Sequence, residues 1–250
     1  MNIKNEIKKL NLKEKMQKNK VSSLNRWEKY YSSLEESYLF PNEYVVRSFL
    51  GSYPNLKMPK DFKGKSICDV GCGDGRNIIA LHKFGFHISG TEITEEVCEL
   101  TRKKLLLHAE KINADLRPGL NDNLPFESEK FDYILSWNAC YYMKSSKSNI
   151  ADHVKELARI MKKDGYMIVS VPSPNCFTLN GSVDLGQGHV RLESQTKWGM
   201  LNGTIVHLFR SFEEIEEKFG VHFKNFQKGF LKDDCYGQPL EYFLFVCQKK

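Results

Sequence analysis

The sequence predicts a doubly wound α/β fold, which is a mostly parallel sheet with helices on both of its faces. Short apolar runs alternate with amphipathic helical patterns along most of the chain, as is typical of parallel strands joined by crossover helices. The first apolar run ends in Asp69-Val70, and three glycines follow at alternate positions, Gly71, Gly73 and Gly75. Glycine tolerates positive φ and lets a ligand approach the backbone. A strand that breaks into such a loop and then opens a helix therefore predicts a cofactor-binding site.

Seven strands are expected, in chain order. They are Ser66 to Val70, His87 to Gly90 with Glu92 at its end, Lys111 to Ala114, Phe131 to Trp137, Tyr166 to Val171, Phe223 to Leu231, and Tyr242 to Gln248. Helices are expected over Arg76 to Phe84 and over the apolar positions between residues 150 and 161. Two further helices begin at polar caps, because Thr94 precedes two glutamates and Ser211 has capping-box spacing with Glu214.

The chain divides into three predicted segments. Residues 1–20 form a leader in which seven lysines stand against two glutamates, so it carries most of the net charge of +6. We expect this leader to be solvated, with phosphates or acidic lipid as the alternative partners. Residues 21–60 form an aromatic-rich helical cap, with a helix from Pro41 to about Leu50. Residues 61–250 form the main domain, in which residues 172–210 are an irregular insertion interrupted by proline and glycine.

Composition narrows the possible classes of protein. A chain of 250 residues with 41% apolar content can build one core. Neither a membrane span nor an apolar signal core is visible, and the seven cysteines form no C-x-x-C pair. We therefore expect a cytoplasmic protein, a monomer or a homodimer, without a zinc or thioredoxin-type site. Outside the leader the charge is nearly balanced, which does not favour a nucleic-acid partner.

The segment Asp69 to Gly75 resembles the first motif of the class I S-adenosylmethionine-dependent methyltransferases, D/E-x-G-x-G-x-G, at every defined position. The resemblance extends, element by element, over residues 66–250, and stand-alone bacterial enzymes with small-molecule acceptors look most similar. It implies a Rossmann-like sheet of seven strands, with the last strand antiparallel beside the fifth. It also implies S-adenosyl-L-methionine as the cofactor and S-adenosyl-L-homocysteine as the product.

The resemblance further implies which residues hold the cofactor. Gly71, Cys72 and Gly73 would pass under its methionyl part, and Asp69 would orient the loop and the cofactor's amino group. Glu92 follows Gly71 by 21 residues, and a carboxylate there can accept both ribose hydroxyls. Other residues implied at the cofactor are Asn77, Ile93, Asp115, Leu116, Ser136, Trp137 and Tyr31.

Three of these assignments have alternatives. Asp115 would meet the adenine amino group after the third strand, but the segment before Leu-Pro-Phe is long and Asp122 competes. Trp137 fits a core position equally well. Tyr31 lies with Trp27 on a leading helix that could instead pack its aromatic side chains on the sheet.

Methyl transfer from a sulfonium depends mainly on positioning, whereas an alcohol acceptor must also lose a proton to a base. His189 and His207 lie in the insertion that, in relatives, forms part of the acceptor pocket, and we expect them to be candidate catalytic bases. A structural role is the alternative for both. Further acceptor-side candidates are Tyr141, Tyr142, Arg191 and Arg210.

Missing motifs also indicate the type of acceptor. The Asn/Asp/Ser-Pro-Pro-aromatic tetrapeptide of base-amino methyltransferases is replaced by Ser136-Trp-Asn-Ala139, and no clustered Asp/Asn set indicates a catalytic metal. We therefore expect O-methylation of a small polar metabolite such as a sugar or a cell-surface polysaccharide precursor. The alternatives are an RNA or protein methyltransferase, an aminopropyl transferase, and a non-catalytic S-adenosylmethionine-binding module.

Overall fold

The computed structural model describes residues 40–108, 110–193 and 201–250. The predicted leader, residues 21–39 of the predicted cap, and both Trp27 and Tyr31 lie outside these residues. Within the described part, no helix is both long enough and apolar enough to cross a membrane.

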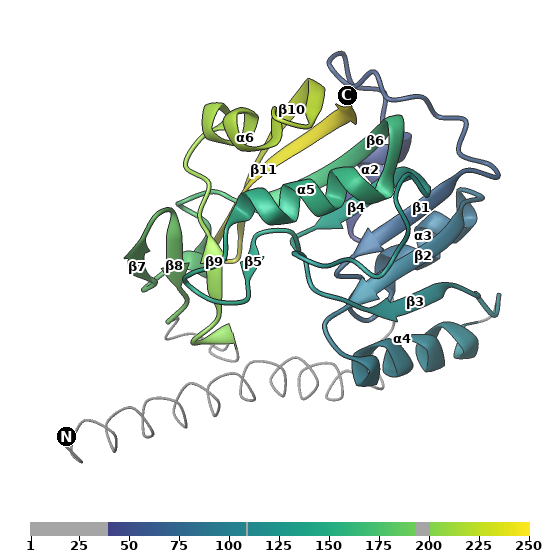
Figure 1. Cartoon of the computed structure of the whole chain (residues 1–250), viewed down its shortest axis with the longest axis horizontal. Helices are drawn as coiled ribbons and strands as arrows, with labels where there is room; N and C mark the ends of the chain where they lie inside the picture. Colours follow the sequence, from purple (N-terminus) through teal and green to yellow (C-terminus); the bar gives the residue numbers. More distant parts are fainter. Residues whose placement is uncertain (1–39, 109, 194–200) are drawn as a thin grey trace, which may run out of the picture.

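The main sheet has seven strands in the spatial order β10-β11-β6-β4-β1-β2-β3 (Figure 1). The strands are β1 (Ser66–Val70), β2 (His87–Glu92), β3 (Asp115–Pro118), β4 (Phe131–Trp137), β6 (Met161–Pro172), β10 (Phe223–Cys235) and β11 (Gln238–Lys249). The strands β3, β2, β1, β4 and β6, which are adjacent in this order, pair in parallel. In contrast, β11 is antiparallel to both β6 and β10. The predicted doubly wound sheet, with its last strand antiparallel beside the fifth strand of the sheet, is confirmed.

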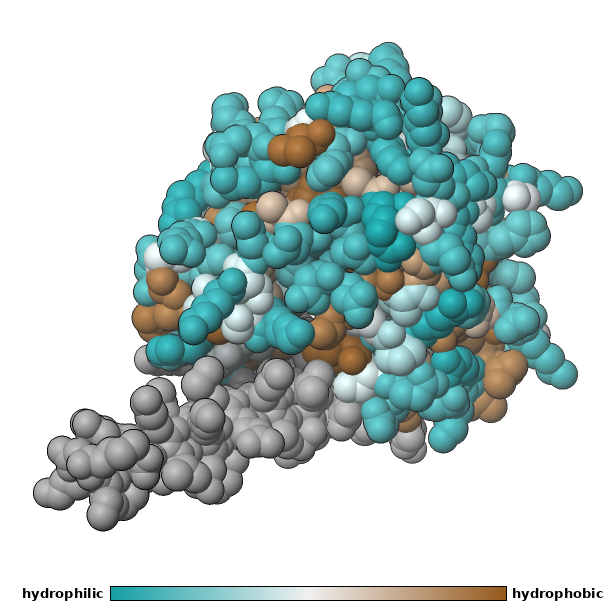
Figure 2. All heavy atoms as spheres, in the orientation of Figure 1, coloured by the Kyte–Doolittle hydropathy of each residue, from teal (hydrophilic) through white to brown (hydrophobic). Residues whose placement is uncertain are grey.

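Helices cover both faces of this sheet, and they bury its central strands on both sides. One face carries α2 (Glu43–Leu50), α3 (Arg76–Lys83) and α4 (Glu95–Leu107), and the other carries α5 (Ile150–Ile160) and α6 (Phe212–Phe219). Along β1, Ile67 joins the core under α3 and Cys68 joins the core under α5. The face shown in Figure 2 is mostly hydrophilic, as expected where polar helix surfaces meet solvent.

The caps follow the sequence signals with one correction. Thr94 accepts a hydrogen bond from the Val97 amide at 3.3 Å, and Ser211 accepts one from the Glu214 amide at 3.3 Å. The helix expected from Pro41 begins instead at Glu43, because Asn42 is its cap and accepts the Tyr44 amide at 2.9 Å. Pro41 therefore lies just outside the helix.

The third strand was predicted wrongly. It covers Asp115–Pro118 rather than Lys111 to Ala114, and Asp115 pairs with Ser89 of β2. Lys111 has a φ of 47°, so the backbone turns at the position where the strand was expected to start. Pairing with β2 thus decides which of two adjacent short segments becomes the strand.

The insertion was predicted as irregular, but it contributes three strands to a second sheet of four, in the order β5-β9-β8-β7, and β5 comes from the segment after β4. The strands are β5 (Tyr142–Met143), β7 (Val183–Gly186), β8 (His189–Arg191) and β9 (Ile205–His207), and a short 3-10 helix (Phe177–Leu179) lies between β6 and β7. These strands have two to four residues, too few to show an alternating pattern in the sequence. The second sheet stands to one side of the main sheet (Figure 1).

Candidate active site

The loop between β1 and α3 owes its shape to three glycines with left-handed backbone conformation. The φ angles are 70° at Gly71, 59° at Gly73 and 85° at Gly75. Only glycine adopts such values readily. A Cβ added at Gly71 would lie 2.6 Å from the Cβ of Ala139. The loop therefore presents bare backbone at the carboxyl end of β1, where open α/β sheets bind ligands.

The Glu92 carboxylate connects this loop to the end of β2. Its Oε1 accepts the Gly73 amide at 2.7 Å, and its Oε2 accepts the Ile93 amide at 3.0 Å. The side chain is buried. Burial raises the pKa of Glu92, the two amides oppose that effect, and nearby Asp74 adds to it. The structure thus holds the predicted ribose-binding carboxylate directly beside the glycine loop.

Asp69 is the most unusual group at the loop. Its side chain is buried, and within the described residues its Oδ2 has no hydrogen-bond partner. Burial raises the pKa of Asp69 well above its usual range, and the carboxylates of Glu92 and Asp74 raise it further. Leaving such an oxygen unpaired costs about 1–3 kcal/mol. A cation bound here would recover that energy, because the carboxylates of Asp69 and Glu92 create a negative potential, whereas Asp74 is paired with Arg76.

Asp74 and Thr101 also shape the loop, although the sequence analysis missed both. Buried Asp74 receives the Arg76 guanidinium, with Nε to Oδ1 and Nη2 to Oδ2 both at 3.1 Å. The Thr101 hydroxyl, on α4, donates to the Gly73 carbonyl at 2.5 Å. The sequence signal for the Thr101 contact was a threonine on the apolar face of the helix predicted to begin at Thr94.

Asn77 and Cys72, two of the predicted cofactor residues, are both buried. The Asn77 Oδ1 accepts the amide of Asn42 at 3.0 Å, so it ties α2 to the first turn of α3. Burial raises the pKa of the Cys72 thiol well above its usual range, so the side chain stays a neutral thiol beside the loop.

Ser136 and Trp137 end β4, next to the glycine loop strand. The Ser136 hydroxyl is buried and accepts the Cys140 amide at 3.1 Å. Trp137 is half-buried and packs against the core under α2 and α3. This packing supports the interpretation of Trp137 as a core residue. Because Trp137 also lies at the carboxyl end of a strand, contact with the cofactor stays a prediction.

Asp115 needs a correction. It was expected to follow the third strand, but it opens β3 and lies three residues before the strand's carboxyl end. Its carboxylate pairs with Arg117 at 2.9 Å and with Lys130 at 3.5 Å. Lys130 directly precedes β4, so Asp115 faces the amino ends of the strands, away from the loop edge. Leu116, the next residue, is buried in the core. The competing Asp122 does follow β3 and is half-buried.

Polar side chains line the carboxyl edge of β6 and the neighbouring part of β11. Buried Glu241 accepts from the Ser173 hydroxyl and from the Asn175 amide, both at 3.1 Å, and pairs with Lys232 at 3.0 Å. These bonds lower the pKa of Glu241, most of all the bond to Lys232. The sequence analysis assigned none of these four residues.

The structure brings His189 and His207 together, but not to the glycine loop. They are paired across β8 and β9, with ring centroids 5.5 Å apart. Both line a pocket of about 240 Å³ whose walls contain none of the residues at the loop, at Glu92 or at the end of β4. Of the other acceptor-side candidates, Tyr141 stacks on Tyr142 at 4.6 Å, and Arg191 pairs with Glu193 at 2.7 Å. No three His, Cys, Asp or Glu side chains in the described ranges are grouped to hold a metal ion.

The sequence and the fold of this chain are similar to those of known methyltransferases. The model of the methyltransferase domain family matches residues 46–221. An uncharacterized methyltransferase, YcgJ of Bacillus subtilis, is 26% identical over 138 residues, which is 53% of each chain. The ubiquinone biosynthesis O-methyltransferase of Dinoroseobacter shibae is 28% identical over 139 residues, covering 53% of this chain and 52% of the relative. The chain thus matches about half the length of these relatives.

A solved S-adenosylmethionine-dependent methyltransferase from Methanosarcina mazei superposes with a TM-score of 0.60. The alignment covers 79% of this chain and 98% of that one at 17% sequence identity. At this identity the superposition shows a shared fold.

Proposed function

The chain belongs to the class I S-adenosylmethionine-dependent methyltransferases, and on that premise we propose that it methylates an oxygen atom of a small polar metabolite. The observation that carries the assignment of the site is the unpaired buried oxygen of Asp69 beside three left-handed glycines. S-adenosylmethionine has a cationic sulfonium and a cationic amino group, so it fits a cradle with three buried carboxylates.

Each part of the cradle has a separate task in this proposal. Asp69 binds the amino group of the cofactor, and that cation stabilises the ionised form of its carboxylate. Glu92 accepts the ribose hydroxyls while it keeps its bond to the Gly73 amide. The glycine loop excludes side chains from the space that the cofactor needs. When bound, the cofactor supplies the methyl group, and the protein holds it in line with the acceptor oxygen.

The acceptor is proposed to lie over the carboxyl ends of β4 and β6. Hydrogen-bonding groups are concentrated there, including Asn138 with Ser170 at 2.8 Å and the Glu241 cluster with Ser173 and Asn175. Such an edge suits a metabolite with several hydroxyl groups, for example a sugar. The name of the distant ubiquinone biosynthesis relative supports transfer to oxygen. The catalytic base remains a proposal, and His189 and His207 stay candidates only if the acceptor reaches their pocket.

The test is turnover of S-adenosylmethionine labelled in its methyl group against a panel of sugars, sugar nucleotides, phenols, amines, RNA and protein. We expect label in an oxygen-linked methyl group of a small hydroxylated compound, located by NMR. Transfer to nitrogen, or to RNA or protein alone, would contradict the proposed acceptor class. Tight cofactor binding without transfer to any acceptor would instead favour a non-catalytic binding module.

A further inference from the structure

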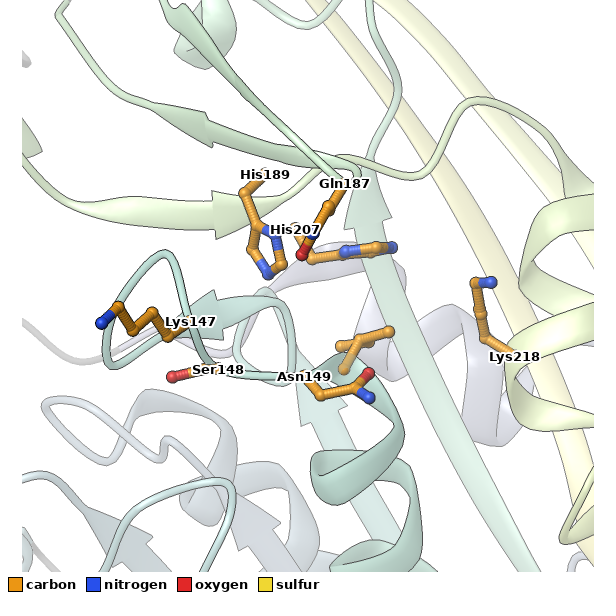
Figure 3. Close-up of a pocket in the computed structure, with 8 residues that line it drawn as sticks. Lys147, Ser148, Asn149, Gln187, His189, His207 and Lys218 are labelled. Carbon is orange, nitrogen blue, oxygen red and sulfur yellow. The ribbon is translucent and has the colours of Figure 1, made fainter.

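A second pocket lies between the small sheet and the α5–α6 face of the main sheet, away from the cofactor cradle. It has a volume of about 240 Å³. Its walls come from the loop before α5, from β8 and β9, and from α6. The lining residues include Lys147, Ser148, Asn149, His189, His207 and Lys218 (Figure 3). The pocket shares no lining residue with the cradle, and the glycine loop leads into α3 on the opposite face of the sheet from α5 and α6.

The pocket contains hydrogen-bonding capacity that the described residues do not use. His189 is 4% exposed and His207 is 3% exposed, and none of their four ring nitrogens has a hydrogen-bond partner within the described part of the chain. The nearest carboxylate oxygen to His207 Nε2 is on Glu214 at 3.6 Å, which is too long for a hydrogen bond. Buried polar atoms are normally paired, so two adjacent unpaired imidazoles point to a bound partner.

The charges around the pocket indicate the sign of that partner. Lys147 and Lys218 stand on either side of the histidine pair (Figure 3). The first turn of α5, capped by Asn149, adds the positive end of a helix dipole. Two acids are nearby: the Glu214 Oε2 already accepts the Arg210 amide at 2.8 Å, and the Glu217 Oε1 accepts from Lys218 Nζ at 2.8 Å. Burial is the main cause that lowers the pKa of His207 to about 4, and His189, Lys218, Arg210 and His153 contribute to the same shift. These neighbours make the potential at the ring positive.

We propose that this pocket binds a phosphate-type anion, with the two imidazole rings donating hydrogen bonds to its oxygens. A neutral imidazole has one N–H donor, so His189 and His207 together supply two donors in a site from which water is largely excluded. The beginning of α5 supplies backbone dipoles of the kind that stabilise anions. The volume also leaves room for part of a carrier attached to the phosphate group.

The anion could be inorganic phosphate or the phosphoryl group of a metabolite, and both present the same oxygens. The experiment uses the full chain in phosphate-free buffer and follows the ¹⁵N and ¹H shifts of its histidine side chains. Inorganic phosphate and uridine diphosphate are titrated separately. We expect saturable shifts of His189 and His207, whereas exposed His87 should stay unmoved. A diphosphate that binds at least tenfold more tightly would identify a phosphorylated metabolite, and equal affinities would identify the free anion.

Two variants complete the test. His189→Leu replaces an unpaired buried ring with an apolar side chain, so the protein should keep its thermal midpoint while phosphate affinity falls at least tenfold. His87→Gln is its control. Lys218→Gln should weaken binding about threefold, whereas Lys155→Gln, an exposed change on α5, should not. Unmoved His189 and His207 signals, equal phosphate affinity in His189→Leu, or a response to Zn²⁺ in place of phosphate would each overturn the proposal.

Discussion

The glycine-loop cradle and the histidine pocket both contain buried polar atoms that lack a partner among the described residues, but they differ in charge and origin. Asp69, Asp74 and Glu92 make the cradle acidic, whereas His189 and His207 sit among lysines and a helix N-terminus. The cradle is formed largely by one short stretch of sequence, and the pocket is assembled from three distant segments. In both sites, a ligand would pair with polar atoms whose burial costs free energy. The surrounding charges then decide whether that ligand is a cation, as in the cradle, or an anion, as in the pocket.

The largest effect on this comparison is expected from Glu92→Ala. The change removes the acceptor of the Gly73 amide and, in our proposal, of the ribose hydroxyls. Affinity for S-adenosylmethionine should fall by about 3 kcal/mol, roughly 100-fold. Calorimetric titration measures it, with exposed Glu96→Ala as the control on the same side of the cradle. Equal affinities in the two variants would remove Glu92 from the site.

Asp69→Asn tests whether the cradle needs its unpaired charge. Affinity for S-adenosylmethionine should fall by about 2 kcal/mol, or about 30-fold, because a charged hydrogen bond to the amino group is lost. The free energy of unfolding of the cofactor-free variant should rise, since the buried carboxylate is destabilising once it ionises. The pKa of Asp69 is raised, so wild-type stability falls as the pH increases above the ordinary value of 3.8.

Urea unfolding and titration calorimetry measure the two quantities separately. The exposed carboxylate of Asp61 provides the control, because Asp61→Asn should change neither. A drop in both stability and affinity for Asp69→Asn would show that Asp69 supports the fold rather than a ligand.

The histidine pocket should respond to pH in the opposite direction. The folded pKa of His207 is about 4, below its ordinary value of 6.5, so the unfolded chain takes up the proton first as the pH falls. Stability should be full above pH 6.5 and should decline toward pH 4, by about 2 kcal/mol between pH 7.5 and 5. Urea unfolding in phosphate-free buffer measures the decline.

His207→Gln should flatten most of this pH dependence. A smaller part should remain, because burial also lowers the pKa of His153. An unchanged slope in His207→Gln would show that His207 is hydrated and titrates normally.

The smallest effect is expected from Gly71→Ala. Comparison with Gly64→Ala, outside the glycine loop, separates the effect of a steric clash from that of an unfavourable backbone conformation. Gly71 and Gly64 both have positive φ, 70° and 76°, but an added Cβ meets Ala139 at 2.6 Å only in the first case and has no atom within 4 Å in the second. Gly71→Ala should lower cofactor affinity about tenfold, whereas Gly64→Ala should reduce stability by about 1 kcal/mol and leave affinity unchanged. Similar affinities for S-adenosylmethionine in both variants would mean that the loop can shift to accommodate a side chain at position 71 without losing the cofactor.

Much of the fold could be predicted because its signals are local. The strand ends at Val70 and at Trp137, and the caps at Thr94 and Ser211, lie where the sequence places them. The third strand was placed wrongly, since its position depends on pairing between Asp115 and Ser89 of β2. The small sheet escaped prediction for the same reason, because its short strands acquire their pattern only from one another.

By itself, the sequence determined the left-handed loop of glycines, the order of the strands and helices of the main sheet, and the acidic residue that ends β2. These follow from backbone conformational freedom and from apolar periodicity, which act over a few residues. Tertiary structure alone decided that Asp69 keeps an unpaired oxygen and that His189 faces His207. Burial and pairing of this kind depend on which distant segments exclude water from a side chain, and no local pattern of residues records that.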